Sequence, residues 1–129
     1  MSEPEWVHPS VVTAIHADQL ARYGGTPGVR DAGALESALL RPRNAWMYEG
    51  VNDVPALAAR YLVALARGHA FIDGNKRTAF VTALLFCECN GVIVQGDEAG
   101  AVDFAVRAAT GDAAVAEIAT WLRDHGRPH

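Results

Sequence analysis

The sequence predicts one all-α domain, residues 1–129, built as a bundle of six helices with a central buried helix and a short flap. Three observations lead to this prediction. The chain of 129 residues has the length of a single domain, and half of its residues are apolar. Apolar residues recur with helical spacing along most of it. Residues 79–87 are apolar on every side except at Thr82, which is the pattern of a buried helix.

The first two expected helices are bounded by proline, glycine and a capping aspartate. A helical pattern opens at Pro9 and runs to Tyr23, where two glycines end it. Asp31 is a good N-cap for a second helix that reaches Leu40, because its carboxylate can accept a hydrogen bond from a first-turn N–H. We expect Pro42 to stop this helix, since proline lacks the N–H that the helix interior requires.

The stretch from residue 43 to residue 52 shows no helical pattern. Trp46 and Tyr48 stand at alternate positions, and a period of two is the spacing of an extended strand. We therefore expect a short extended flap at this point of the chain.

Four further helices complete the expected fold. Asp53 is the N-cap of the first of them, and Gly68 breaks it. The next is the buried helix, which the chain enters near Asn75. The expected bounds are 53–68, 75–91, 98–109 and 112–125, with a short extended segment at Val92–Val94 after the buried helix.

The turn between the third and fourth helices is unusually polar for a segment that leads into a buried helix. It reads Arg-Gly-His-Ala-Phe-Ile-Asp-Gly-Asn-Lys-Arg from residue 67 to residue 77. Lys76 and Arg77 place two cations at a helix N-terminus, where the helix dipole disfavours them by up to about 1 kcal/mol each. A bound phosphate would compensate for both charges, and Gly74 would let the backbone approach it closely.

Asp73 and His69 extend this interpretation from phosphate binding to catalysis. A carboxylate beside a phosphate is favourable when Mg²⁺ lies between them, and an imidazole can take a proton from an attacking hydroxyl near neutral pH. A base, a metal ligand and a phosphate clamp are the parts needed for phosphoryl or nucleotidyl transfer. Each residue alone has a simpler explanation: His69 as a helix C-cap, Asp73 as an N-cap, Asn75 as a turn residue, and Lys76 and Arg77 as a solvated face.

The joint order and spacing of these residues resembles the signature of the Fic/Doc family, H-x-F-x-[D/E]-G-N-G-R-x-x-R. Lys76 replaces the second glycine and Phe80 replaces the second arginine. Both changes are typical of the death-on-curing (Doc) branch, which reads H-x-F-x-x-x-N-K-R. The likeness covers nearly the whole chain. The residues that match the signature are His69, Phe71, Asp73, Gly74, Asn75 and Arg77.

The resemblance implies a role for each residue of the turn. His69 would be the general base that activates a Ser or Thr hydroxyl of the target protein, and Asp73 would hold Mg²⁺. Phe71 would anchor the turn in the core, and the stretch from Trp46 to Tyr48 would be the flap that aligns the target segment. The residues that would bind the phosphates of ATP are Arg67, Gly74, Asn75, Lys76 and Arg77.

The resemblance further implies a toxin of a type II toxin–antitoxin system. It would transfer the γ-phosphate of ATP to a translation factor, elongation factor Tu in this family, and so arrest translation. Two alternatives stay open: AMP transfer, which Gly74 would suit, and a non-catalytic corepressor that only binds its antitoxin. The expected antitoxin has a disordered tail that folds as a helix into a groove of the toxin.

Composition limits the other partners. The formal net charge of −4 and the pI near 5.6 argue against direct nucleic-acid binding. No apolar run reaches the ~20 residues of a membrane span, and the acidic N-terminus is unlike a signal peptide. Cys87 and Cys89 are two positions apart on a helix and point to different sides, so they cannot easily pair, and we expect two small buried thiols in a reducing, cytoplasmic environment.

Overall fold

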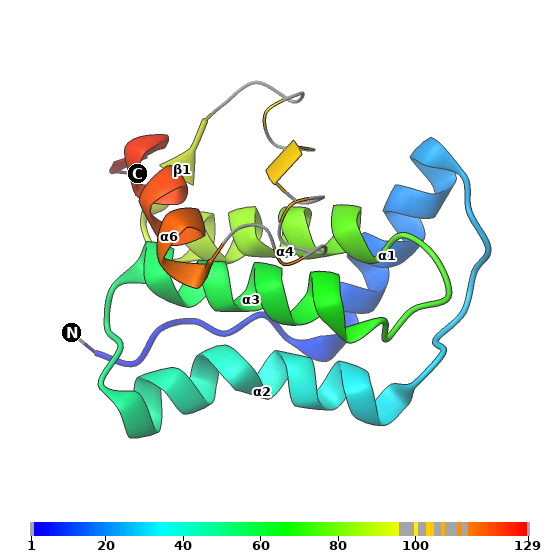
Figure 1. Cartoon of the computed structure of the whole chain (residues 1–129), viewed down its shortest axis with the longest axis horizontal. Coiled ribbons are helices and arrows are strands. Elements are labelled where there is room, and N and C mark those ends of the chain that lie inside the picture. The colour runs from blue at the N-terminus through cyan, green and yellow to red at the C-terminus, as the bar shows by residue number, and fades with distance from the viewer. Residues whose placement is uncertain are drawn as a thin grey trace.

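The computed structural model describes residues 2–95, 100, 103–104, 107, 111 and 114–128, and its architecture is mostly helical (Figure 1). Two short strands pair with each other. None of the helices in the described ranges combines the length and the hydropathy needed to cross a membrane. The elements are α1 (Pro9–Tyr23), α2 (Ala32–Glu49), α3 (Val54–Gly68), α4 (Asn75–Cys89), β1 (Val92–Val94), α6 (Val115–Asp124) and β2 (Gly126–Pro128).

Helix α1 begins and ends where the sequence predicts. His8 is the N-cap residue, and its Nδ1 accepts a hydrogen bond from the Ser10 N–H at 3.1 Å. Gly24 follows the helix with a φ of 81°, and its N–H donates to the Leu20 carbonyl at 2.7 Å. A proline at the start and a positive-φ glycine after the end therefore set both bounds.

Helix α2 is longer than predicted. Asp31 caps it as expected, but the helix passes through Pro42 and ends only at Glu49. A proline inside a helix leaves the carbonyl four residues earlier, here that of Ala38, without its N–H partner. Pro42 is fully buried, and we attribute the continuation of the helix to the packing of its ring in the interior.

The extended flap expected around Trp46 and Tyr48 is wrong, because both residues are helical. Positions two apart on a helix point to different sides. Trp46 packs on the core, with its ring centroid 6.2 Å from that of Trp6, whereas Tyr48 is 77% exposed. The alternation that indicates a strand in the sequence is therefore the spacing of one inward and one outward position on a surface helix.

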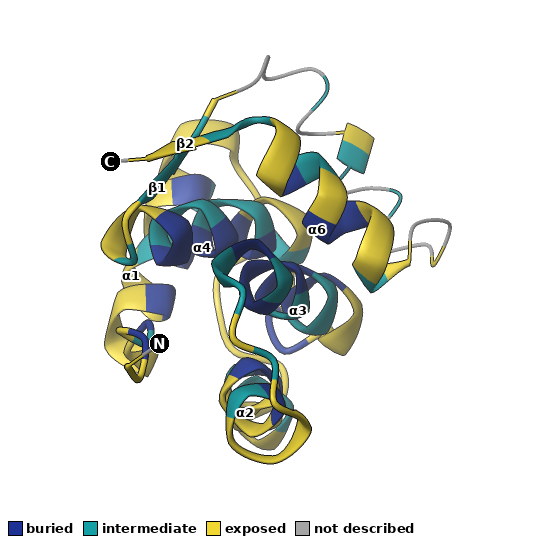
Figure 2. Ribbon diagram, turned by 90° about the vertical axis from the view of Figure 1, so that its left-hand side faces the viewer, coloured by how far each residue is buried: buried dark blue, intermediate teal, exposed yellow. Residues whose placement is uncertain are grey.

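Helices α3 and α4 form the interior. Asp53 caps α3 as predicted and accepts a hydrogen bond from the Ala56 N–H at 3.1 Å. Residues 78–87 of α4 are all buried or half-buried, which confirms the buried helix. Helix α3 packs against α2, α4 and α6, whereas α4 packs mainly against α3, α1 and β1. Figure 2 shows α3 between α2 on one side and α4 and α6 on the other, so the central position expected for the fourth helix is not confirmed.

Residues 2–8 run along the bundle and close one side of the core. The Val7 N–H donates to the Tyr61 hydroxyl at 3.1 Å, and burial raises the pKa of this hydroxyl above its ordinary value. Glu5 exchanges two hydrogen bonds with Asn90: its N–H donates to Oδ1 at 2.8 Å, and its carbonyl accepts from Nδ2 at 2.9 Å. The N-terminal segment is thereby tied to both interior helices.

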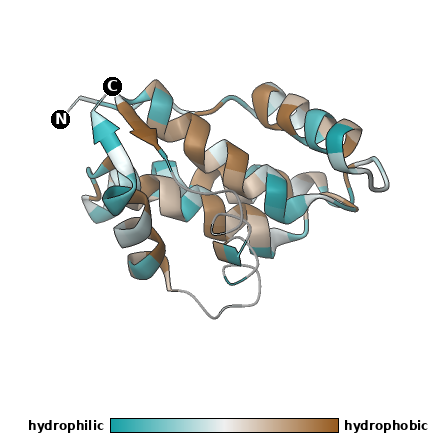
Figure 3. Cartoon of the chain, turned by 90° about the horizontal axis from the view of Figure 1, so that it is seen from above, coloured by the Kyte–Doolittle hydropathy of each residue, from teal (hydrophilic) through white to brown (hydrophobic). Residues whose placement is uncertain are grey.

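The C-terminal part confirms some predictions and adds one strand. The predicted extended segment is β1, which pairs antiparallel with the unexpected strand β2, with Ile93 opposite Arg127. Figure 3 shows the apolar strand β1 beside the polar strand β2. Helix α6 confirms the last predicted helix, although its first residue is Val115. The helix expected at 98–109 lies mostly outside the described residues, so the number of six helices is not confirmed.

The two cysteines have different environments. Cys87 is buried, and burial raises the pKa of its thiol to about 12. Cys89 is exposed. The expectation of a buried thiol is therefore correct for Cys87 and wrong for Cys89, which is the last residue of α4.

Replacement of Asp53 tests the link between α3 and α6, because its carboxylate caps α3 and also pairs with Arg123 of α6. We expect Asp53→Ala to lower the free energy of unfolding by about 1–2 kcal/mol, since it removes the cap and the pair together. Asp53→Asn should cost about 0.5 kcal/mol, because asparagine still caps and the pair is half-exposed. Urea unfolding measures both, and equal losses would contradict the capping role.

Candidate active site

The loop from residue 69 to residue 74 joins α3 to α4, and Asn75 closes it. The Asn75 Oδ1 accepts a hydrogen bond from the Phe71 N–H at 3.0 Å, and its Nδ2 donates to the Phe71 carbonyl at 2.9 Å. The Phe71 side chain is buried, as an anchor must be. These contacts hold the loop in a tight turn directly before α4.

His69 ends α3 in a left-handed conformation, with φ 49° and ψ 39°. It is the only non-glycine with a positive φ among the described residues, and this conformation costs about 1–2 kcal/mol. The next residue, Ala70, is held in place, because its carbonyl accepts hydrogen bonds from the N–H groups of Arg30 at 2.7 Å and Asp31 at 3.1 Å. The simple interpretation of His69 as a C-cap is thus correct for its backbone, while the residue stays exposed.

Asp73 is held by both its main chain and its side chain. Its Oδ2 accepts a hydrogen bond from the Thr26 N–H at 2.9 Å, and its carbonyl oxygen lies 2.7 Å from Nε2 of His16. The N-cap position of α4 belongs to Gly74 instead, so the alternative interpretation of Asp73 as an N-cap is wrong. Asp73 is exposed, which leaves its carboxylate accessible to a ligand.

The N-terminus of α4 carries positive charge and no side-chain cap. Gly74 has a φ of 77° and ψ of 15°, and among the described residues no side chain accepts a hydrogen bond from the first turn. Lys76 and Arg77 are both exposed. The Arg77 guanidinium lies over the Tyr23 ring, with its central carbon 4.4 Å from the ring centroid, a cation–π contact that orients this side chain.

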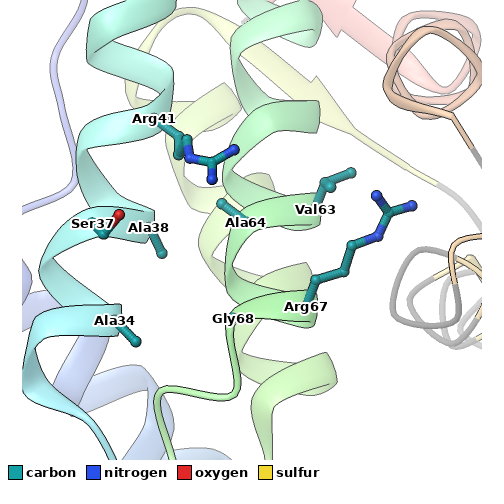
Figure 4. Close-up of a pocket in the computed structure, with 8 residues that line it drawn as sticks. All are labelled: Ala34, Ser37, Ala38, Arg41, Val63, Ala64, Arg67 and Gly68. Atoms are coloured by element: carbon teal, nitrogen blue, oxygen red, sulfur yellow. The ribbon is translucent and has the colours of Figure 1, made fainter.

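Arg67 lies in the last turn of α3, two residues before His69, and is exposed. It borders a groove of about 290 Å³ between α2 and α3. Figure 4 shows that Arg41 extends from α2 toward α3, whereas Arg67 extends from the opposite side of α3. Most of the lining consists of small side chains, and the lining residues are Ala34, Ser37, Ala38, Arg41, Val63, Ala64, Arg67 and Gly68.

An extended segment between α1 and α2 lies beside the loop. Val29 forms an isolated antiparallel bridge with Phe71, and the Ile72 N–H donates to the Gly28 carbonyl at 3.1 Å. A Cβ at Gly28, where φ is 121°, would lie 3.1 Å from the Ile72 side chain, so glycine suits this close approach. The segment next to the site is therefore the one around Gly28 and Val29, and not the one around Trp46.

Three residues that touch the site escaped the sequence analysis. They are His16 and Tyr23 of α1 and Thr26 of the following turn. For His16 the available signal is a histidine in the middle of a helix, with apolar or small residues directly before and after it at Ile15 and Ala17. Thr26 carries no such signal, because it contributes only its backbone N–H.

Comparisons with known proteins place the chain in a family. The Fic/DOC family matches residues 6–87, which is more than half of the chain. Over 117 residues the chain is 44% identical to Protein kinase doc of Escherichia phage P1, and the match covers 91% of this chain and 92% of that protein. Over 78 residues it is 47% identical to Toxin Doc of Mycolicibacterium smegmatis, and the match covers 58% of each chain. The chain therefore belongs to the Fic/DOC family.

Its branch within the family follows from the same matches. The relative that matches nearly the whole chain is named a protein kinase, and the second is named a toxin. Lys76 and Phe80, the two departures from the Fic signature, agree with that assignment. The protein is thus a toxin of the Doc type with protein kinase activity.

Gly74 and Gly50 provide a matched test of how tightly the loop packs on α1. Both glycines have a left-handed backbone conformation. A Cβ at Gly50 would meet nothing within 4 Å, whereas a Cβ at Gly74 would lie 3.3 Å from the Leu20 side chain and 3.5 Å from that of His16. We expect Gly50→Ala to lower the free energy of unfolding by about 1 kcal/mol, and Gly74→Ala to lower it further. Urea denaturation of the two variants makes the comparison. Equal losses would mean that α1 yields to the added methyl without cost.

Proposed function

We propose that the protein transfers the γ-phosphoryl group of Mg²⁺-bound ATP to a Ser or Thr hydroxyl of a translation factor, elongation factor Tu being the first candidate, and so arrests translation. One observation carries the proposal: a single short loop presents an exposed histidine, an exposed carboxylate and an uncapped, positively charged helix N-terminus. These are the groups that phosphoryl transfer needs from a protein.

The phosphates would bind at the start of α4. The N–H groups of its first turn have no intrahelical partners, as at any helix start, and no described side chain caps them. Lys76 and Arg77 would add two cations there, and Arg67 a third from the end of α3. Gly74 would permit the backbone to approach a phosphate. The Asn75 carboxamide already binds Phe71, so Asn75 would contribute through its backbone N–H.

Asp73 would hold the magnesium ion. Its Oδ2 accepts the Thr26 N–H, and no described residue donates to Oδ1. Within the described ranges, no group of three or more His, Cys, Asp or Glu side chains could cage a metal by itself. Mg²⁺ suits such a site, because it binds through one or two carboxylates together with the phosphates of the substrate. When bound, the ion would supply charge neutralisation on the phosphate oxygens.

His69 would act as the general base. The target hydroxyl oxygen attacks the γ-phosphorus, and its proton passes to a nitrogen of the imidazole. A new oxygen–phosphorus bond forms while the bond to the β–γ bridging oxygen breaks, and ADP leaves with that electron pair. Imidazole suits this role near neutral pH, and its exposure lets it meet a side chain on another protein.

Two residues favour γ-phosphoryl transfer over AMP transfer. Lys76 stands where Fic nucleotidyl transferases have a glycine that leaves room for a phosphate. Phe80 stands where they have an arginine that clamps the γ-phosphate. Here Phe80 is half-buried and packs edge-on against Trp121 of α6, with ring centroids 6.3 Å apart. A nucleotide in the Fic orientation would therefore lose contacts at both ends.

The toxin relationship implies an antitoxin. We infer that it acts in trans through a segment that folds as a helix on the toxin. Fic proteins that inhibit themselves direct a glutamate at the second arginine of the signature, and Phe80 takes that position here. An internal glutamate would thus lack its usual partner.

Isotopic labelling tests the reaction type. The protein is incubated with cell extract and Mg²⁺ and with ATP labelled at either the α- or the γ-phosphorus. We expect label in a protein band only from the γ-position, because only the terminal phosphoryl group is transferred. Mass spectrometry of the labelled band then identifies the target and the modified hydroxyl. Label from the α-position would instead establish AMP transfer.

Substitution of His69 tests whether catalysis causes toxicity. We expect His69→Ala to reduce the rate of phosphoryl transfer by roughly 10²–10⁴-fold, because the hydroxyl loses its base. Growth arrest on expression should then disappear at equal protein levels. His8→Asn is the matched control, since asparagine also caps α1 and the site lies elsewhere. Arrest that persists in His69→Ala would favour the non-catalytic corepressor.

A further inference from the structure

His16 of α1 is a buried polar residue whose described contacts all lead to the loop of the candidate active site. Only 5% of its surface is exposed. It lies 57 residues before Asp73 in the sequence, outside the Fic/Doc signature. A buried polar side chain is normally retained for a specific hydrogen bond, so its partner indicates what it does.

The hydrogen bond of His16 is to the main chain of Asp73. Nε2 of the ring lies 2.7 Å from the Asp73 carbonyl oxygen. A carbonyl oxygen can only accept, so Nε2 must carry the hydrogen and donate it. This contact fixes the orientation of the peptide group between Asp73 and Gly74, because that group is planar.

The same ring contacts a second residue of the loop and lies close to a third. It stacks on Phe71 with centroids 3.8 Å apart and an interplanar angle of 11°. Its Cδ2 lies 3.5 Å from the position that a Cβ of Gly74 would take. One rigid side chain from α1 thus contacts the anchor of the loop and the predicted metal ligand, and it lies beside the N-cap of α4.

We propose that His16 is a positioning residue that holds the Asp73 carboxylate in place for Mg²⁺-ATP. Among the described residues, two hydrogen bonds hold Asp73 itself: the Thr26 N–H binds its Oδ2, and His16 binds the main-chain carbonyl beside the side chain. Without the hydrogen bond from His16, we expect the peptide group after Asp73 to lose its fixed orientation, so that Oδ1 is held less firmly in one direction. This inference rests on the proposed function, because it assigns Asp73 to the metal.

Two substitutions separate the hydrogen bond from the packing. His16→Phe keeps an aromatic ring to stack on Phe71 but removes the donor to Asp73. His16→Gln removes the ring but places an amide N–H at about the reach of Nε2. Gln19→Met is the control, since Gln19 is a second buried polar residue of α1 and its described hydrogen bond is to Asp18.

The experiment measures ATP binding by calorimetry with Mg²⁺ and with EDTA, alongside urea unfolding without ligand. Mg²⁺ should increase the ATP affinity of the wild type, and we expect this increase to be roughly 10-fold smaller in His16→Phe. A loss of that size is typical when the residue that supports a metal ligand is removed. The affinity of His16→Phe in EDTA should stay close to that of the wild type. Asp73→Asn should lose the magnesium effect as well, His16→Gln should recover part of it, and Gln19→Met should retain all of it.

The outcomes distinguish the two proposals. If the wild type gains no affinity from Mg²⁺, the proposed metal site fails and this inference fails with it. If the wild type gains affinity and His16→Phe gains just as much, only the role of His16 is overturned. Equal losses with Mg²⁺ and with EDTA would make His16 a purely structural residue. If His16→Phe does not fold, the comparison is made between His16→Gln and Gln19→Met. A smaller gain in ATP affinity from Mg²⁺ in His16→Gln supports the proposal, and an equal gain refutes it.

Discussion

The reciprocal hydrogen bonds between Asn75 and Phe71 are the interaction on which the site depends. They close the loop immediately before α4, and the buried Phe71 ring fastens it to the interior. The backbone from His69 to Arg77 is thereby anchored to the packed core and does not form a mobile surface turn. Groups fixed in this way need little reorganisation when charge develops on a substrate, which is the main source of electrostatic catalysis.

Local chemistry made much of the fold predictable. Pro9, the glycines after Tyr23 and the capping carboxylate of Asp53 each act on the nearest turn, so their effects can be judged from neighbouring residues alone. Pro42 could not be judged that way, because its position within α2 depends on the interior that receives its ring. Strand β2 escaped prediction for the same reason, since a segment as polar as Gly126–Pro128 becomes a strand only beside β1.

In the candidate site, too, the residues that could be predicted are those close together in the sequence, and the others depend on tertiary packing. The residues of the signature, from His69 to Arg77, follow one another in the sequence, so their proximity can be predicted without knowledge of the fold. Thr26 and His16 reach Asp73 from positions 47 and 57 residues away, and only the packing of α1 on α4 places them there. At Phe80 the sequence shows only that the arginine of the Fic signature is absent. The structure adds that the Phe80 side chain packs against Trp121 at the edge of the core.

The docking of the N-terminal segment has a consequence for the synthesis of the chain. Val7 and Tyr61 are 54 residues apart, and Glu5 and Asn90 are 85 apart. A nascent chain leaves the ribosome N-terminus first, so Val7 waits for Tyr61 of α3, and Glu5 waits for Asn90 until the whole of α4 has emerged. Closing a loop of that length carries an entropic cost that only the completed α3 and α4 can offset. The core is therefore sealed late in translation, and a nascent chain that stops short of Asn90 lacks one of the two attachments of residues 2–8.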